Sequence, residues 1–343
     1  MPKPRNNLVQ RLRDNWLELL LIAIFLAALF WIFQVTRGIW IAANAEPTAT
    51  PTVRPLIEGK PTRTPTPTPV PAAIAQEFDQ ARALDLVVSL VALGPRPLGS
   101  EAHDAAADAI VAELNRAGWQ VEEQTSDIGG VPLRSIVGKA GSGPLIVLGT
   151  HYDTPPLADL DPEMDNRSLP VLGANDGASG AAVLLELARS LDKDTLGNTV
   201  WLAFVDGQYP PTGGEPVSAG AKSLAEALPP EALPQAVVLL DLVGGLDQKF
   251  AVDQNSDPAL TQALWSVAQQ LGLEAWFLPE TAGAVDNGVL AFRQRDIPAA
   301  NIAGQGYPYR RTVKDTVDKI VAASLGRVGR LLKAYLENQT TAK

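Results

Sequence analysis

From residue 73 onward the chain alternates two kinds of hydrophobic pattern. Short runs of consecutive apolar residues predict strands, and their lack of polar alternation is typical of strands covered on both faces. These runs occupy residues 144–150, 199–205, 236–243 and 298–304. Elsewhere apolar residues recur every three or four positions, as in an amphipathic helix: at Ala106, Ile110 and Leu114, across 178–191, and at Leu325, Val328, Leu332 and Tyr335. Strands that alternate with helices predict an α/β fold, here a three-layer α/β/α domain over residues 73–340 with a mostly parallel mixed central sheet.

Near the N-terminus, residues 19–33 form an apolar run that has no polar face. With its continuation to residue 41 it reaches the length of a membrane-spanning helix. Four basic residues precede the run and one follows it. By the positive-inside rule this predicts that residues 1–18 are cytoplasmic and that the C-terminal domain is extracytoplasmic. The alternative is a cleaved signal peptide ending at Ala43-Asn44-Ala45, but the run is long for a signal peptide and this site lies well beyond it. We therefore expect an uncleaved single-pass anchor over residues 19–41.

Residues 42–72 are rich in alternating proline and threonine. This composition disfavours helices and central strands and favours extended polyproline II. The segment is predicted to be a stalk that holds the following domain away from the membrane.

The composition of the chain excludes several classes of partner and mechanism. The 343 residues carry a net charge of −10, so we expect no nucleic-acid partner, which would require a basic face. The absence of cysteine excludes thiolate catalysis, disulfides and cysteine-ligated zinc. Only His103 and His151 are histidines, which excludes any mechanism that needs several of them.

Polar side chains follow several of the predicted strands. His151 and Asp153 follow the first, and Asp241 lies near the end of the third. Asp176 lies among glycines just before a predicted helix. Because the carboxyl ends of parallel strands meet at one sheet edge, these four residues are expected to form a cluster of hard ligands that binds a divalent metal.

Taken singly, each of these residues has a structural explanation. Asp176 could cap the helix that starts near Ala178, and Asp206-Gly207, which follows the second strand, could be a simple turn. His103 stands apart in a helix-opening stretch, where a surface or capping role is expected.

The motifs at these positions resemble those of the family-28 zinc exopeptidases, which include bacterial aminopeptidases and glutaminyl cyclases. The similarity covers nearly the whole domain. It is carried by GPRPLGS (94–100), GTHYDT (149–154), GANDGASGAAVLLELAR (173–189), LLDLVG (239–244), VDNGVLAFRQRDIPAANI (285–302) and YPYRRTVKDTVDKI (307–320).

The resemblance implies a zinc site at the carboxyl edge of the sheet. His151, Asp176 and Asp241 would hold one metal, and Asp153 would orient the metal histidine. Asp176, an acidic residue after the Asp-Gly turn and a histidine in the closing motif would hold a second. A glutamate directly after the turn would be the general base.

The sequence departs from this pattern at the second metal. Gln208 replaces the general base, and an amide cannot take a proton from water. Tyr209 stands where a ligand is expected and could ligate only as phenolate. Arg311 replaces the histidine of the closing motif, and a guanidinium has no lone pair to offer. Zinc at the one remaining site is therefore the only cofactor expected.

We hypothesise that Arg311 pairs with Asp176 and supplies the positive charge of the missing metal. The alternative is that Arg310 and Arg311 point to solvent. An acid could also have moved, with Glu215, Asp153 or Asp286 as candidates. Asp206, Asp286 and Arg310 are expected to line the cleft.

Two functional interpretations remain. The favoured one is a membrane-anchored, catalytically impaired family member that binds a peptide or protein ligand through the old cleft. The alternative is an active zinc-dependent aminopeptidase or glutaminyl cyclase that acts on peptide N-termini with a rearranged base. A purely structural membrane protein is a third and weaker possibility, because it would not need the acidic cluster.

Overall fold

The computed structural model describes residues 78–284 and 288–341. The expected cytoplasmic segment (1–18), anchor (19–41) and stalk (42–72) lie outside these residues, as does Asp286, so those expectations remain predictions. Within the two described ranges, no helix has both the length and the apolar character needed to cross a bilayer.

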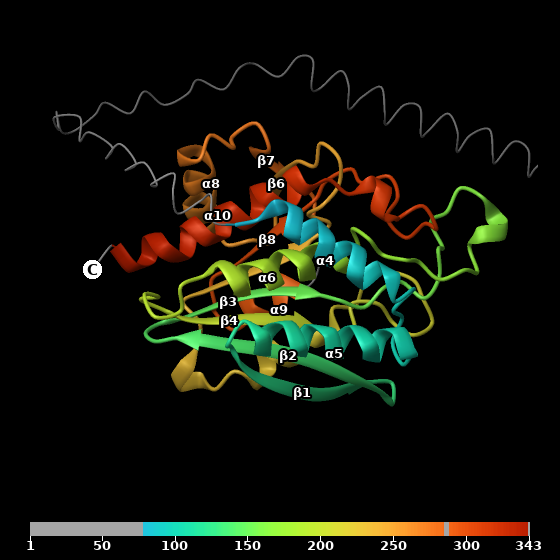
Figure 1. The fold of residues 1–343 in the computed structure, drawn as a ribbon, viewed down its shortest axis with the longest axis horizontal. Helices are drawn as coiled ribbons and strands as arrows, with labels where there is room; N and C mark the ends of the chain where they lie inside the picture. Colours follow the sequence, from blue (N-terminus) through green and yellow to red (C-terminus); the bar gives the residue numbers. More distant parts are fainter. Residues whose placement is uncertain (1–77, 285–287, 342–343) are drawn as a thin grey trace, which may run out of the picture. The chain divides into compact units, whose positions relative to one another are not determined.

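The fold is built on a six-stranded mixed sheet, as predicted (Figure 1). Its strand order is β1-β2-β4-β3-β5-β8, and the four strands from β4 to β8 run parallel to one another. Strand β2 pairs antiparallel with β4 and with the edge strand β1. The bounds of these strands are β1 Gln120–Ile128, β2 Val131–Gly141, β3 Leu145–His151, β4 Thr199–Val205, β5 Ala236–Asp241 and β8 Ala299–Ala303.

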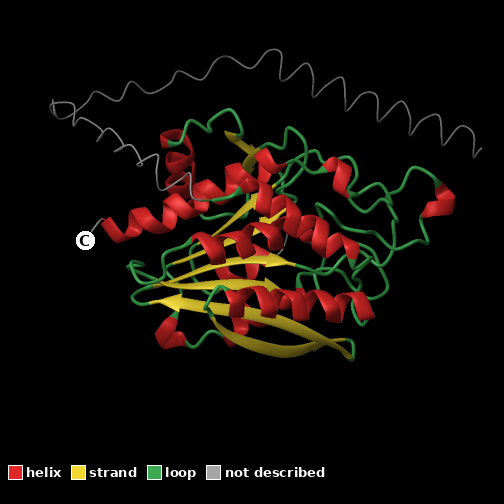
Figure 2. Cartoon of the chain, viewed as in Figure 1, coloured by secondary structure: helices red, strands yellow, loops and turns green. Residues whose placement is uncertain are grey.

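Helices cover both faces of the sheet, which gives the three layers (Figure 2). Alternate residues of one strand enter different cores: Ile146 and Leu148 of β3 pack on one side and Val147 on the other. The first core includes residues of α4 (Gln80–Ala92), α5 (Glu101–Arg116), α6 (Ala178–Ser190), α8 (Pro258–Gln270) and α10 (Ala322–Thr341). The second is formed with α7 (Ala219–Ala227) and α9 (Gly288–Arg293). Burial on both faces explains why the central strands read as unbroken apolar runs.

The elements that sequence analysis missed include strands β1 and β2, helices α4, α7, α8 and α9, and a second, smaller sheet. Strand β1 is an edge strand with no fully buried residue, so its sequence lacks an apolar signal. It joins β2 through Gly129-Gly130, both at positive φ, which is typical of a tight hairpin turn. A separate two-stranded parallel sheet contains β6 (Phe250–Asp253) and β7 (Phe277–Ala282).

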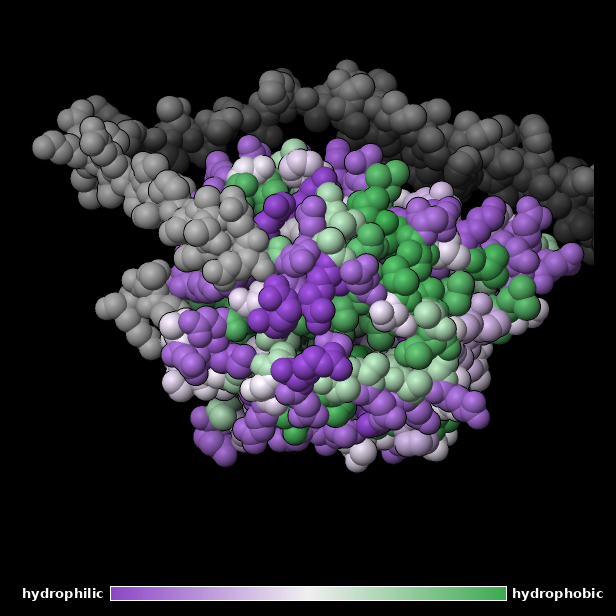
Figure 3. Space-filling view, viewed as in Figure 1, coloured by the Kyte–Doolittle hydropathy of each residue, from purple (hydrophilic) through white to green (hydrophobic). Residues whose placement is uncertain are grey.

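The surface on the side of α4 and α5 carries both polar and hydrophobic residues. Figure 1 shows both helices on the viewer's side of the sheet, and hydrophobic residues gather over part of this face in Figure 3. A hollow of about 300 Å³ between the two helices is lined mainly by apolar residues, among them Leu86, Leu90 and Leu93. The polar chemistry lies elsewhere, at the carboxyl edge of the sheet.

Candidate metal centre

Three buried side chains converge at the carboxyl ends of β3 and β5 and in the loop before α6. His151 is the last residue of β3, Asp241 is the last of β5, and Asp176 precedes α6. One ligand atom from each lies within 4.8 Å of the others. His151 Nε2 is 3.3 Å from Asp176 Oδ1 and 3.5 Å from Asp241 Oδ1. The structure thus brings together the three residues that sequence analysis selected as metal ligands.

These three residues fit a divalent cation. Asp176 Oδ1 is buried and accepts no hydrogen bond from the residues that the structure describes. One imidazole and two carboxylates are a donor set that zinc accepts in catalytic sites, where a fourth position stays open. The trio therefore forms a candidate site for one metal ion.

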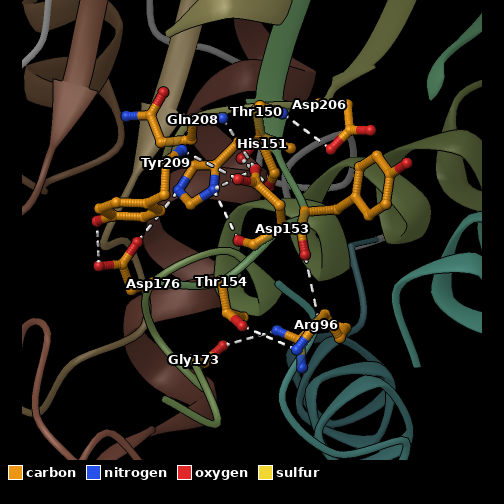
Figure 4. A network of polar contacts seen from close by, with 12 residues as sticks. Arg96, Thr150, His151, Asp153, Thr154, Gly173, Asp176, Asp206, Gln208 and Tyr209 are labelled. Carbon is orange, nitrogen blue, oxygen red and sulfur yellow. Dashed lines mark hydrogen bonds and ion pairs between the residues drawn. The ribbon is translucent and has the colours of Figure 1, made fainter. Parts of the chain in front are cut away.

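Asp153 contacts the His151 side of the cluster and orients its imidazole (Figure 4). Its main-chain carbonyl oxygen is 3.0 Å from His151 Nδ1, and its carboxylate is 3.4 Å from the same atom. A hydrogen bond from Nδ1 leaves Nε2 facing the two carboxylates. The Asp153 carboxylate also accepts the backbone N–H groups of Gln208 and Tyr209. Asp153 thus connects the His151 strand to the turn that carries the altered residues.

Tyr209 occupies the far side of Asp176. Its hydroxyl donates to Asp176 Oδ2 over 2.6 Å, and its ring meets the His151 ring edge to face, with centroids 6.0 Å apart. Burial and the Asp176 charge raise the pKa of Tyr209 well above its usual value, so the side chain is a neutral phenol that donates a hydrogen bond. Gln208, at the position of the expected general base, is also buried.

Arg311 does not pair with Asp176, so that hypothesis is wrong. Its guanidinium binds Asp159 and Glu215, with Nη1 2.7 Å from Glu215 Oε1. Arg311 has a left-handed backbone (φ 55°), which is uncommon for a residue other than glycine. It is buried, so the solvent-facing alternative is wrong for it as well. Glu215 is held on this outer ion pair, with an 80 % exposed side chain.

Arg310 is the guanidinium at the cluster. Burial disfavours its cation, but the neighbouring Tyr209, Asp241 and Asp176 hold its pKa above the usual value. Its Nε is buried and has no hydrogen-bond partner among the described residues. The positive charge that acts on Asp176 is therefore that of Arg310, one residue earlier in the chain than expected.

The cluster strongly favours charged forms. Burial lowers the pKa of His151, but its close contacts with the carboxylates of Asp153, Asp176 and Asp241 outweigh it and raise the pKa well above the usual value. Burial raises the pKa of Asp176, but His151, Arg310 and Tyr209 together hold it below the usual value.

His103 is not a surface or capping residue; it is only 2 % exposed. Its Nε2 is 2.9 Å from Asp206 Oδ1, and its ring stacks on Tyr152 at a centroid distance of 5.0 Å. Asp206 also accepts the N–H groups of Arg134 and Gly207, so it secures the turn after β4. A sequence signal existed, since His103 lies four residues before Ala107 on the buried stripe of α5.

Sequence analysis assigned no role to two buried charged residues, Arg96 and Asp315. Both lie inside motifs that carry the family resemblance, which was the available signal. Asp315 accepts the N–H groups of Asn175 and Asp176 and the hydroxyl of Tyr307. Burial and the charge of Asp176 raise its pKa to about 7. Arg96 contacts the other side of the same loop.

A hollow of about 320 Å³ opens beside the cluster. That volume is at the small end of ligand pockets. Arg310 lines it, together with Leu242, Gly283, Ala284, Gly304, Gln305, Gly306 and Tyr307. A larger hollow of about 470 Å³ lies between α7 and α9, but none of the cluster residues lines it. His151, Asp176 and Asp241 line neither hollow, and Arg310 and Leu242, which follows Asp241, relate the smaller one, the cleft, to the cluster.

Known structures share this architecture. A leucine aminopeptidase precursor from Bacteroides thetaiotaomicron is 28 % identical, with a TM-score of 0.71 over 76 % of this chain and 97 % of that one. A glutaminyl cyclase from the same organism, bound to N-acetylhistamine, is 26 % identical with a TM-score of 0.71, over 76 % and 98 %. A Zn-dependent exopeptidase from Parabacteroides distasonis is 26 % identical with a TM-score of 0.69, over 76 % and 98 %.

Sequence comparison agrees with the structural likeness. The uncharacterized protein YfbL of Escherichia coli is 37 % identical over 97 residues, a match that spans 28 % of this chain and 28 % of that protein's length. The profile of Peptidase family M28 matches residues 134–336, which contain the whole metal cluster and the altered turn. The chain belongs to peptidase family M28.

Proposed function

We propose that this family M28 protein is catalytically impaired and binds a peptide or protein segment through the cleft beside the metal cluster. The observation that carries the proposal is the 2.6 Å hydrogen bond from Tyr209 to Asp176, the carboxylate that two metals would share. The charge of Arg310 also acts on Asp176, so a phenol and a cation lie on the side of this carboxylate where we propose that a second metal would bind in other family members. Neither group binds zinc in that state.

The replacement of the expected general base by Gln208 supports the same conclusion. The amide of Gln208 has no carboxylate to receive a proton from water. Losing such a group costs about 10²–10⁴ in rate. The nearby acids have other partners, since Asp153 accepts two backbone N–H groups and Glu215 pairs with Arg311.

One zinc ion is compatible with this proposal. His151, Asp176 and Asp241 would hold it. A bound zinc would supply a Lewis acid that polarises a carbonyl or a water molecule. With Gln208 in place of the base, the site is better suited to hold a ligand carbonyl or amine than to turn it over.

The cleft beside the cluster would accept one side chain or a chain end. Its lining combines Arg310, Gln305 and Tyr307 with apolar and glycine positions, which suits a short peptide segment better than a large apolar ligand. The proposal includes a membrane anchor over residues 19–41, with residues 1–18 in the cytoplasm and the domain outside it, as the sequence pattern favours.

An active aminopeptidase or glutaminyl cyclase is the second candidate. It is favoured by one observation, the complete His151, Asp176 and Asp241 trio. Such an enzyme would need a base other than Gln208.

Metal analysis and activity assays of the purified protein separate the two candidates. We expect at most one zinc per chain, and no aminopeptidase or glutaminyl-cyclisation turnover above that of His151→Ala. Stoichiometric zinc together with turnover that His151→Ala abolishes would establish the enzyme instead.

A further inference from the structure

Arg96 is a fully buried cation that binds main-chain carbonyl groups. Its guanidinium lies 3.0–3.3 Å from five carbonyl oxygens, those of Leu90, Gly94, Tyr152, Leu172 and Gly173. Among the described residues, no carboxylate forms an ion pair with it. Burying a cation in this way is costly unless its donors are satisfied. Arg96 must therefore secure a feature of the fold that is worth this cost.

Three of these carbonyl groups, those of Tyr152, Leu172 and Gly173, belong to the two segments that carry His151 and Asp176. Tyr152 directly follows His151, and Gly173 lies three residues before Asp176. The Arg96 main chain also exchanges hydrogen bonds with Thr154, through its N–H and its carbonyl oxygen. Figure 4 shows Arg96 below the cluster, with dashed lines to Thr154 and Gly173.

The two loops pack backbone against backbone at this point. Gly173 has φ +62°, and a Cβ added there would lie 2.4 Å from Thr154 Cγ2. A Cβ added at Gly177 would lie 2.6 Å from the carbonyl oxygen of Asp153. The distance between the loops is therefore fixed closely, and Arg96 is the side chain that bridges them.

Asp315 completes the arrangement from the other side of the Asp176 loop. It accepts the N–H groups of Asn175 and Asp176, whereas Arg96 binds the carbonyl oxygens of Leu172 and Gly173. The loop thus gives its carbonyl groups to the Arg96 guanidinium and two of its N–H groups to the Asp315 carboxyl group. Burial lowers the pKa of Arg96 to about 10, with the charges of Asp315, Asp153 and Asp176 opposing that effect, so the guanidinium stays charged at neutral pH.

We propose that Arg96 is a positioning residue that clamps the His151 loop to the Asp176 loop and thereby sets the spacing of the metal ligands. The inference rests on the proposed metal-holding role of His151, Asp176 and Asp241, but not on whether the protein turns over a substrate. A planar fork with five N–H donors suits this task, and lysine cannot reproduce it.

The test compares Arg96→Lys with the full wild-type chain by hydrogen exchange and by Zn²⁺ titration against a chromophoric chelator. We expect the amides of residues 150–154 and 172–177 to exchange about tenfold faster or more, while the central strands keep their protection. Zinc affinity should fall about 10–100-fold, the usual cost of losing a partner that orients metal ligands.

Arg295→Lys is the matched control. Arg295 also donates to main-chain carbonyl oxygens, those of Ala225 and Leu228, but away from the cluster. The Arg295→Lys variant should leave hydrogen exchange in both loops unchanged, and zinc affinity as well. Wild-type exchange of both loops in Arg96→Lys would overturn the proposal. An increase spread evenly over the sheet and α10 would also overturn it, because that result describes general destabilisation.

Asp315→Asn keeps the proposal testable if Arg96→Lys does not fold. It should speed exchange of residues 172–177 and weaken zinc binding, and unchanged exchange there would contradict the clamp. If the wild type binds no zinc, the metal-holding role fails, and hydrogen exchange still decides whether Arg96 clamps the loops.

Discussion

The two halves of the metal centre share Asp176 but have different neighbours. On one side of this carboxylate, His151 and Asp241 complete a set of three ligand atoms within 4.8 Å of one another. On the other side, Tyr209 donates a hydrogen bond and Arg310 adds a positive charge. The same strand-end architecture positions both halves, so the difference lies in side-chain chemistry alone.

This difference indicates how a fold can keep a site while changing its chemistry. The Tyr209 phenol binds Asp176 Oδ2 and the charge of Arg310 acts on the same carboxylate, which a simple deletion of ligands would not provide. An unpaired buried carboxylate would be strongly destabilising. The altered half, formed by Asp176, Tyr209 and Arg310, is therefore stable without a metal. The intact half, formed by His151, Asp176 and Asp241, can be tested separately from it.

The largest expected effect comes from restoring the second half. Gln208→Glu and Tyr209→Glu, combined with either Arg310→His or Arg311→His, should raise zinc content from at most one ion to two. Hydrolysis of aminoacyl chromogenic substrates should rise by about 10²–10⁴ over the wild type, the range that a general base contributes. Zinc content and initial rates are the measurements.

Comparing Arg310→His with Arg311→His also tests which of the two positions can supply a ligand to the second metal. The family pattern favours residue 311, whereas the side-chain placement favours residue 310. Gln208→Glu alone is the control, because it restores the base and leaves the second metal position filled. If this single change gave full activity, Tyr209 and Arg310 would not be what limits the site.

Zinc binding by the intact half should depend on His151 and not on His103. His151→Ala should reduce zinc affinity by more than about a hundredfold, because even an orienting partner costs about 10–100-fold when it is lost. His103→Ala should leave zinc affinity unchanged, since His103 binds Asp206 and not the cluster. Chelator competition measures both variants. Equal losses in the two variants would mean that the trio is not the metal site.

Tyr209→Phe should move stability and zinc affinity in opposite directions. In metal-free protein it leaves Asp176 Oδ2 without its hydrogen bond, at a cost of about 1–3 kcal/mol in unfolding free energy. This corresponds to roughly 2–4 °C in Tm for each kcal/mol. Zinc affinity should rise, because Asp176 no longer has a competing donor. Thermal melts with and without zinc measure both effects.

Tyr152→Phe is the matched control for that experiment. The Tyr152 hydroxyl also donates a 2.6 Å hydrogen bond, but to the carbonyl oxygen of Arg134. The Tyr152→Phe variant should lower the free energy of unfolding and leave zinc affinity unchanged. A Tyr209→Phe variant whose zinc affinity did not rise would show that Tyr209 does not compete with the metal.

Sequence patterns predicted the central sheet and the intact half well, for a physical reason. Buried parallel strands must be apolar throughout, and their carboxyl ends must meet, so His151 and Asp241 were expected at one edge. The direction of Arg311 was not predictable, because its partners Asp159 and Glu215 are distant in the sequence. The motif GPRPLGS pointed to Arg96 but not to its role, since its partners are carbonyl groups that every residue carries.

The smallest expected effect concerns the turn that carries the altered half. Burial lowers the pKa of His103, but its hydrogen bond to Asp206 and that carboxylate's charge outweigh burial, so the pKa is raised. A raised histidine pKa contributes stability that is complete below the unfolded value of about 6.5 and is lost as pH rises through the folded value. Burial also raises the pKa of Asp206, which acts in the same direction.

His103→Gln should therefore flatten the decline in stability between neutral and mildly alkaline pH. His151 contributes a decline of its own, but it is present in both proteins, so the difference between their Tm values isolates His103. Zinc affinity at fixed pH should not change, because Asp206 anchors the turn of the altered half and no ligand of the intact half. A parallel loss of zinc affinity would show that the two halves are coupled through this turn.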